Sequence, residues 1–125
     1  MARGTALVAA ALTAALIATG SGCADDSPPT RPRDGRVNIV LDDFLISPQR
    51  IRAGPGPISF EATNRGKVGH TLHVLRGDRE VVALKTVLPG GSGAGAGRFT
   101  PGEYKLVCIL GNHEELGMYG TLTVR

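Results

Sequence analysis

From residue 37 onward, apolar and polar residues alternate in short runs that turn residues interrupt. Alternation with a period of two predicts β-strands, whose successive side chains point to opposite faces. Proline, glycine and asparagine at the interruptions favour turns. No window of useful length shows the 3.6-residue period of a helix. The pattern predicts seven strands, at residues 37–44, 49–53, 57–63, 70–76, 80–88, 103–109 and 118–125.

Short strands without helices predict an all-β fold. Such strands bury their apolar faces by stacking as two sheets, so we expect a two-sheet Greek-key β-sandwich over residues 37–125. The low-complexity segment Pro89–Gly97 is rich in glycine and alanine, which is typical of flexible linkers. We therefore expect a flexible loop there. A phosphate-binding loop would require a Lys-Ser/Thr ending followed by a helix.

The first 22 residues have the layout of an export signal. A single positive charge at Arg3 precedes an uncharged apolar run at residues 5–18, and small residues follow at positions 19–22. This order is typical of a signal peptide at residues 1–22, so we expect the protein to be exported. A membrane-spanning helix is the alternative, but the run is alanine-rich and barely long enough to cross a bilayer.

Cys23 directly follows two small residues. This arrangement resembles the lipobox of bacterial lipoproteins, which implies lipidation of Cys23 and a lipid anchor in the membrane. Gly20 stands where the lipobox prefers a branched aliphatic residue, and ordinary signal-peptidase cleavage after Ala24 would instead give a secreted or periplasmic protein. The charged, proline-bearing residues 23–36 predict a flexible tether to the folded domain.

Charge and composition argue against a nucleic-acid-binding role. The 14 basic and 11 acidic residues give a net charge of +3, and aromatic residues make up 4% of the chain. The basic residues are scattered singly, whereas a nucleic-acid-binding domain carries a basic stripe or patch and aromatic side chains on which bases stack. The 18 glycines and 8 prolines fit a turn-rich β domain.

Cys108 is the one cysteine of the mature domain, because Cys23 lies in the N-terminal segment. It therefore has no partner for an internal disulfide. A lone thiol in an oxidising compartment is buried and inert, paired with another chain, or used as a ligand.

The segment after residue 107 gathers donor atoms that suit a soft metal. Cys108, His113 and Met118 are spaced Cys-x4-His-x4-Met, and Met118 is the only methionine after the initiator. Three donors on one short loop between strands can converge on one ion. His70, at the start of a predicted strand, is the candidate for a fourth donor. Two imidazoles and a thiolate, with a weak axial thioether, form the type 1 (blue) copper site.

Three motifs resemble those of the cupredoxins. They are Pro101-Gly-x-Tyr-x3-Cys108, Gly117-Met-x-Gly-x-Leu-x-Val124 and Asn64-x-Gly-x3-His70. The resemblance covers residues 37–125, and the loop spacing is similar to that of rusticyanin, auracyanin and the phytocyanins. It implies one copper ion held by His70, Cys108, His113 and Met118. Many cupredoxins place an asparagine after the first histidine, where this chain has Thr71.

Each candidate residue also has a structural interpretation. A single histidine is more often a hydrogen-bonded polar residue than a ligand, Cys108 can be a small buried hydrophobe, and Met118 can fill the core. Their joint occurrence favours ligation. His73 has the opposite strand parity to His70 and matches no ligand position, so we expect a structural role. Glu114 and Glu115 are expected to form a solvated face of the loop or to help dock a basic partner.

The resemblance implies an electron carrier that exchanges single electrons with redox protein partners and acts as a monomer, not an enzyme. A copper-binding module for buffering or delivery is the alternative, although such proteins favour Met/His-rich or exposed Cys-pair sites. A copper enzyme would need a further catalytic copper with several more histidines, and only His73 is spare. A binuclear site would need a second cysteine within residues 109–112, which contain none.

Overall fold

The computed structural model describes residues 27–125. Within this range no helix is long and apolar enough to cross a membrane. The described part of the chain forms nine β-strands: β1 (Arg36–Asp42), β2 (Leu45–Ser47), β3 (Arg50–Ala53), β4 (Gly56–Asn64), β5 (His70–Arg76), β6 (Arg79–Val87), β7 (Ser92–Phe99), β8 (Gly102–Val107) and β9 (Tyr119–Val124).

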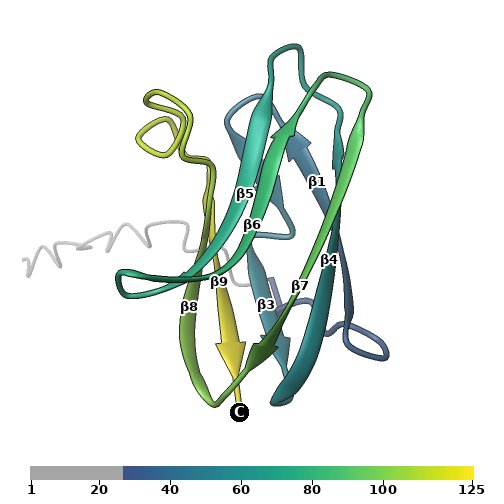
Figure 1. Ribbon diagram of the computed structural model, residues 1–125, viewed down its shortest axis with the longest axis vertical. Helices are drawn as coiled ribbons and strands as arrows, with labels where there is room; N and C mark the ends of the chain where they lie inside the picture. Colours follow the sequence, from purple (N-terminus) through teal and green to yellow (C-terminus); the bar gives the residue numbers. More distant parts are fainter. Residues whose placement is uncertain (1–26) are drawn as a thin grey trace, which may run out of the picture.

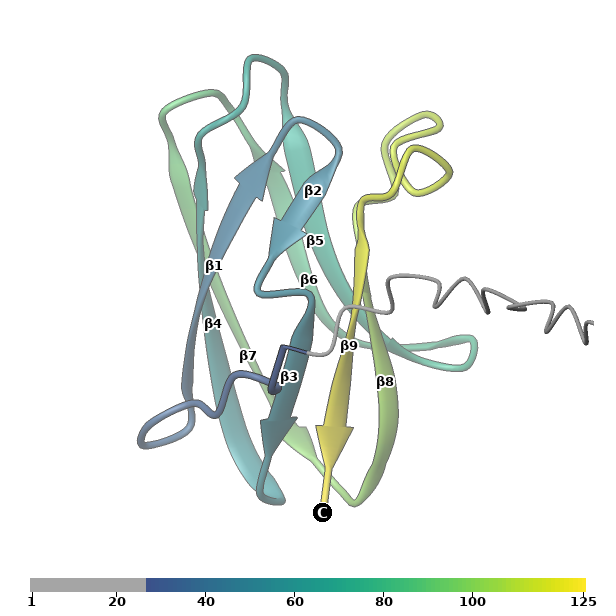
Figure 2. The same ribbon diagram turned by 180° about the vertical axis from the view of Figure 1, so that it is seen from behind.

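The strands form two sheets that stack as a sandwich (Figures 1 and 2). One sheet has the order β2-β1-β4-β7 and the other β3-β9-β8-β5-β6. The pairs β1–β4 and β3–β9 are parallel, and the remaining neighbours are antiparallel. The predicted all-β, two-sheet sandwich is confirmed.

The core lies between the two sheets and follows the alternation in the sequence. Along β4 the buried side chains fall at every second position, Ile58, Phe60 and Ala62. Alternate residues are also buried along β1, in the same sheet, and along β9, in the opposite sheet. This packing is the reason that the apolar pattern predicted seven of the nine strands to within a few residues. β5 differs, because its first five residues are all buried, as expected for a strand covered on both faces.

The expectation of a flexible loop at Pro89–Gly97 is wrong, because Ser92–Phe99 form β7 and pair with β4 along its whole length. The glycines have a steric reason. A Cβ added at Gly95 would lie 2.8 Å from Leu84 Cδ1 and 3.0 Å from Val82 Cγ1 of β6. Small residues therefore let the two sheets approach at this edge, and a composition typical of linkers conceals a strand with period-two alternation.

The first predicted strand, 37–44, is also corrected. β1 ends at Asp42, and the chain turns through Asp43 and Phe44 into β2, which pairs antiparallel with β1. The Asp43 backbone N–H donates to the Asp42 carboxylate (2.8 Å), and Phe44 has a positive φ of 63°. Aspartate favours turns because its carboxylate can accept a hydrogen bond from a nearby backbone N–H. The turn matters for the site described below.

The predicted signal peptide (residues 1–22) and the lipidation site Cys23 lie outside the described residues. The predicted tether lies partly within them. Thr30 forms an isolated bridge with Ile51 of β3, donating to the Arg50 carbonyl (2.9 Å) and accepting from the Arg52 N–H (3.0 Å). Backbone pairing with the sandwich thus begins six residues before β1. The chain then enters β1 through a turn at Asp34 and Gly35, closed by a hydrogen bond from the Arg36 N–H to the Arg33 carbonyl (3.0 Å).

Candidate metal centre

Three connections meet at one end of the sandwich, the upper end in Figure 1. They are the β1–β2 turn, the β4–β5 connection and the loop between β8 and β9. β5 starts at this end with His70, and β8 finishes there just before Cys108. β5 and β8 are paired neighbours, with His73 opposite Val107. The sheet therefore brings two candidate ligands that are 38 positions apart to the same place.

The side chains of His70, Cys108 and His113 converge, with one ligand atom from each lying within 4.8 Å of the others. The two histidines face each other through their Nδ1 atoms at 3.2 Å, and Cys108 Sγ lies 3.5 Å from His113 Nδ1. His70 and Cys108 are fully buried, whereas His113 is half-buried. Two imidazole nitrogens and one sulfur directed at a common point form a donor set that fits a copper ion.

Thr71 holds the sulfur of Cys108 from the neighbouring strand. Its backbone N–H and its hydroxyl both donate to Sγ, at 3.4 and 3.7 Å, and its hydroxyl accepts from the Ile109 N–H at 3.1 Å. The threonine, which stands where many cupredoxins have asparagine, thus links β5 to the cysteine-bearing loop. These contacts hold the sulfur in position, and the thiolate is the form of cysteine that binds metal.

Met118 closes the loop through its backbone. Its N–H donates to the His113 carbonyl (3.0 Å), and its carbonyl accepts from the Cys108 N–H (3.1 Å). Its side chain is fully buried. The three loop residues proposed as ligands are therefore tied to one another by main-chain hydrogen bonds, which keep the loop compact.

The outer part of the loop is held by turns and by one charged contact. His113 N–H donates to the Leu110 carbonyl (3.0 Å), and Gly117 N–H donates to the Glu114 carbonyl (3.0 Å). The Lys105 ammonium on β8 contacts the Glu114 carboxylate. Glu114 is therefore a partner of the domain's own lysine, and its side chain is still 45% exposed.

His113 reaches the surface beside an aromatic ring. The ring of Phe44, from the β1–β2 turn, packs edge-on against the His113 ring with centroids 5.1 Å apart. Phe44 is itself 38% exposed. Phe44 falls within the strand predicted at 37–44, so the apolar pattern alone does not place this phenylalanine at the site.

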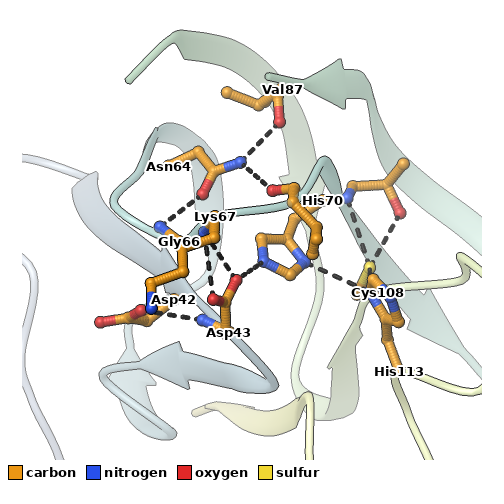
Figure 3. Close-up of polar contacts among 11 residues, drawn as sticks. Asp42, Asp43, Asn64, Gly66, Lys67, His70, Val87, Cys108 and His113 are labelled. Atoms are coloured by element: carbon orange, nitrogen blue, oxygen red, sulfur yellow. Dashed lines mark hydrogen bonds and ion pairs between the residues drawn. The ribbon is translucent and has the colours of Figure 1, made fainter. Parts of the chain in front are cut away.

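Asp43 is the polar residue of this site that the sequence analysis missed. Its Oδ1 lies 3.2 Å from His70 Nε2, on the far side of the ring from His113 (Figure 3). The hydrogen bond from the Lys67 N–H is the largest cause that holds the pKa of the Asp43 carboxyl below its ordinary value, and the nearby His70 acts in the same direction. The available signal was the pair of aspartates that interrupts the apolar alternation.

His73 does not belong to this group. It points elsewhere, and its Nδ1 lies 2.6 Å from the Glu80 carboxylate of β6. The opposite strand parity of His70 and His73 is the reason that one histidine of β5 faces the loop and the other does not.

The fold of this chain is similar to that of several solved structures. A dithionite-reduced auracyanin from Roseiflexus castenholzii superposes with a TM-score of 0.70 at 18% identity, covering 75% of this chain and 99% of that one. An azurin from Methylomonas sp. strain J gives 0.66 at 12% identity, covering 74% and 99%. Auracyanin A of Chloroflexus aurantiacus, described as a "blue" copper protein, gives 0.62 at 13% identity, covering 73% and 100%.

No protein-family model and no curated protein sequence matches the chain. At these low sequence identities the structural likeness shows the fold alone. It agrees with the motifs around His70, Cys108 and Met118, which resemble those of the same family. The chain has the cupredoxin fold, with a His-Cys-His group at the end of its sandwich that fits a type 1 copper site.

Proposed function

We propose that this protein is a type 1 (blue) copper protein that carries single electrons between redox partners outside the cytoplasm. The observation that carries the proposal is the convergence of one ligand atom each from His70, Cys108 and His113 within 4.8 Å in a chain with the cupredoxin fold. Copper bound there would supply the one-electron couple. The chain itself supplies the donors and the rigid setting around them.

The surroundings of the donors suit electron transfer. Thiolate and thioether favour Cu(I), and imidazole also serves Cu(II), so a fixed mixture of the two suits both oxidation states. His70 is fixed by the start of β5, and Cys108 is held by Thr71 and by the Met118 backbone. Donors that move little between states need little reorganisation when an electron arrives or leaves.

Electrons are proposed to enter and leave through His113. Its half-buried ring is the ligand nearest to solvent, since His70 and Cys108 have no exposed surface. The exposed apolar side chains of Phe44 and Leu116 (38% and 51%) lie on the β1–β2 turn and on the ligand loop, respectively. These apolar side chains are the proposed docking surface for a redox protein partner.

Replacing Met118 by leucine is expected to keep the blue colour and to raise the reduction potential. Leucine preserves the buried volume but removes the thioether, and loss of a weak axial donor weakens Cu(II) binding more than Cu(I) binding. A tenfold change in the ratio of the two affinities corresponds to about 59 mV for one electron. Cyclic voltammetry measures the shift, and an unchanged potential would mean that Met118 only fills the core.

Electron carrying can be separated from copper delivery by following the metal. We expect the protein to retain its copper through repeated reduction and oxidation in the presence of a Cu(I) chelator, because Cys108 and His70 are fully buried. Oxidised and reduced molecules should also exchange electrons quickly, as line broadening in NMR spectra would report. Transfer of Cu(I) to the chelator at each reduction would favour buffering or delivery instead.

The location outside the cytoplasm rests on residues 1–22 and on Cys23, whose pattern is that of an exported lipoprotein. The mass of the mature protein from membranes tests this part. A diacylated Cys23 as the first residue supports the lipid anchor, and an unmodified chain beginning at Asp25 indicates a secreted or periplasmic form.

A further inference from the structure

The imidazole of His70 has a different partner at each of its two nitrogens. Nδ1 faces His113 Nδ1 at 3.2 Å, in the group proposed to hold copper. Nε2 faces Asp43 Oδ1 at 3.2 Å on the opposite side (Figure 3). The His70 ring is fully buried, and the Asp43 side chain is 31% exposed. The buried ligand is thus the link between the proposed metal position and a carboxylate near the surface.

The carboxylate decides which nitrogen of His70 carries the proton. An ionised aspartate only accepts hydrogen bonds, so Nε2 must donate to it, and Nδ1 is left with its lone pair directed toward Cys108 and His113. This is the tautomer required for ligation through Nδ1. A carboxylate in this position also holds the plane of the imidazole ring.

Asp43 is itself held in place by the β4–β5 connection. The Lys67 N–H donates to both carboxylate oxygens, at 2.9 and 3.1 Å. Asn64 fixes this connection by accepting from the Gly66 N–H (2.8 Å) and by donating to the Val87 carbonyl (2.8 Å). Figure 3 shows these contacts together with the Asp43–His70 pair, from which the contacts continue to His113. The carboxylate is therefore oriented by donors other than the imidazole.

Gly66 leaves the space that this arrangement needs. A Cβ at Gly66 would lie 2.3 Å from Asp43 Oδ1 and 2.9 Å from His70 Nε2. Both distances are far below ordinary van der Waals contact, so any larger residue would displace the carboxylate from the ring. Glycine at this position is explained by the contact between Asp43 and His70.

We propose that Asp43 is a positioning residue for the metal centre, which fixes His70 as an Nδ1 ligand and favours Cu(II) over Cu(I). The proposal rests on the copper-binding function proposed above. The physical reason is that a negative charge one imidazole away from the metal attracts the doubly charged ion more strongly than the singly charged one. Asp43 therefore lowers the reduction potential of the site.

The test compares two neighbouring carboxylates. Asp43→Asn keeps the shape and an acceptor oxygen for His70 and Lys67 but removes the charge. Asp42→Asn removes the same charge one residue earlier, where the carboxylate accepts from the Asp43 N–H. Loss of a partner of this kind costs about 10-fold to 100-fold in metal affinity. If the loss of affinity falls on Cu(II) alone, each tenfold loss raises the reduction potential by about 59 mV.

We therefore expect Asp43→Asn to raise the reduction potential by at least the equivalent of a tenfold change, and Asp42→Asn to change it by much less. Equal shifts in both variants would show a diffuse effect of surface charge and would overturn the proposal. An unchanged potential in Asp43→Asn would also overturn it. In either case the wild-type protein would still be blue, so the copper assignment itself would stand.

A second pair of variants tests the same contact without changing any charge. Gly66→Ala should displace the carboxylate and raise the potential in the same direction as Asp43→Asn. Gly54→Ala is the matched control, because a Cβ at Gly54 would have no atom within 4 Å, and it should leave the potential unchanged. This pair decides the question even if Asp43→Asn fails to fold.

A measurement on metal-free protein separates this inference from the proposed function. In ¹⁵N-¹H correlation spectra of the wild-type apoprotein, His70 should be the tautomer protonated at Nε2, because Asp43 accepts that proton. Protonation at Nδ1 would overturn the role of Asp43 whether or not the protein binds copper. If the wild-type protein takes up Cu(II) without colour, it is the proposed function that fails.

Discussion

Replacing Cys108 by serine is expected to abolish completely the visible absorption of the Cu(II)-loaded protein. The colour of such a site arises from charge transfer from a thiolate to Cu(II), and Cys108 is the only cysteine in the part of the chain that the structure describes. A serine hydroxyl at the same position is a harder donor that gives no such band. Some copper can remain on His70 and His113, so loss of colour is expected to exceed loss of metal.

The other cysteine supplies the matched control. Cys23→Ser in the full-length chain should leave the absorption unchanged, because Cys23 lies in the N-terminal segment and is not expected to contact copper. Far-UV circular dichroism shows whether Cys108→Ser keeps the β-sandwich, and metal analysis gives its copper content. A Cys108→Ser protein that is folded and still blue would show that the thiolate is not a ligand.

His113→Gly is expected to give a copper site that added imidazole can refill, with the blue spectrum restored from solution. His113 is half-buried at the surface end of the group, and its backbone hydrogen bonds to Leu110 and Met118 do not need its side chain. Removal of the ring therefore opens a cavity toward solvent and leaves the loop in place. Titration with imidazole, followed by visible absorption, measures the recovery.

His70→Gly provides the comparison, and its rescue is expected to be poor or absent. His70 has no exposed surface and is enclosed between Asp43 and His113, so imidazole would have to enter a buried space. Equal recovery of the two variants, or recovery of His70→Gly alone, would show that the assignment of the buried and exposed ligands is reversed. Electron entry through His113 would then lose its support.

The convergence of His70, Cys108 and His113 could be predicted from sequence because three local motifs each specify a position in one fold. The loop spacing brings Cys108 and His113 together locally. His70 was placed by its position at the start of a strand and by a resemblance, since nothing in the linear sequence states that β5 and β8 are neighbours. The structure supplies that pairing.

Asp43 could not be predicted in the same way, because its contact with His70 depends on a turn and on space left by Gly66. The turn at Asp43 interrupts the single strand predicted at 37–44. The need for space at Gly66 becomes visible only when the side chains of Asp43 and His70 are both placed. The error at β7 has a related cause. The high glycine content predicts a flexible loop. In the structure, glycine at every second position lets β7 approach Leu84 of the opposite sheet closely.

The central claim is that His70, Cys108 and His113 hold one copper ion in a type 1 site. Titration of the mature wild-type domain with Cu(II), followed by visible absorption and electron paramagnetic resonance, tests it most directly. We expect an intense blue or green colour that saturates at one equivalent of copper, with a single Cu(II) signal of a thiolate-bound site. A colourless Cu(II) complex, or colour that fails to saturate at one equivalent, would contradict it.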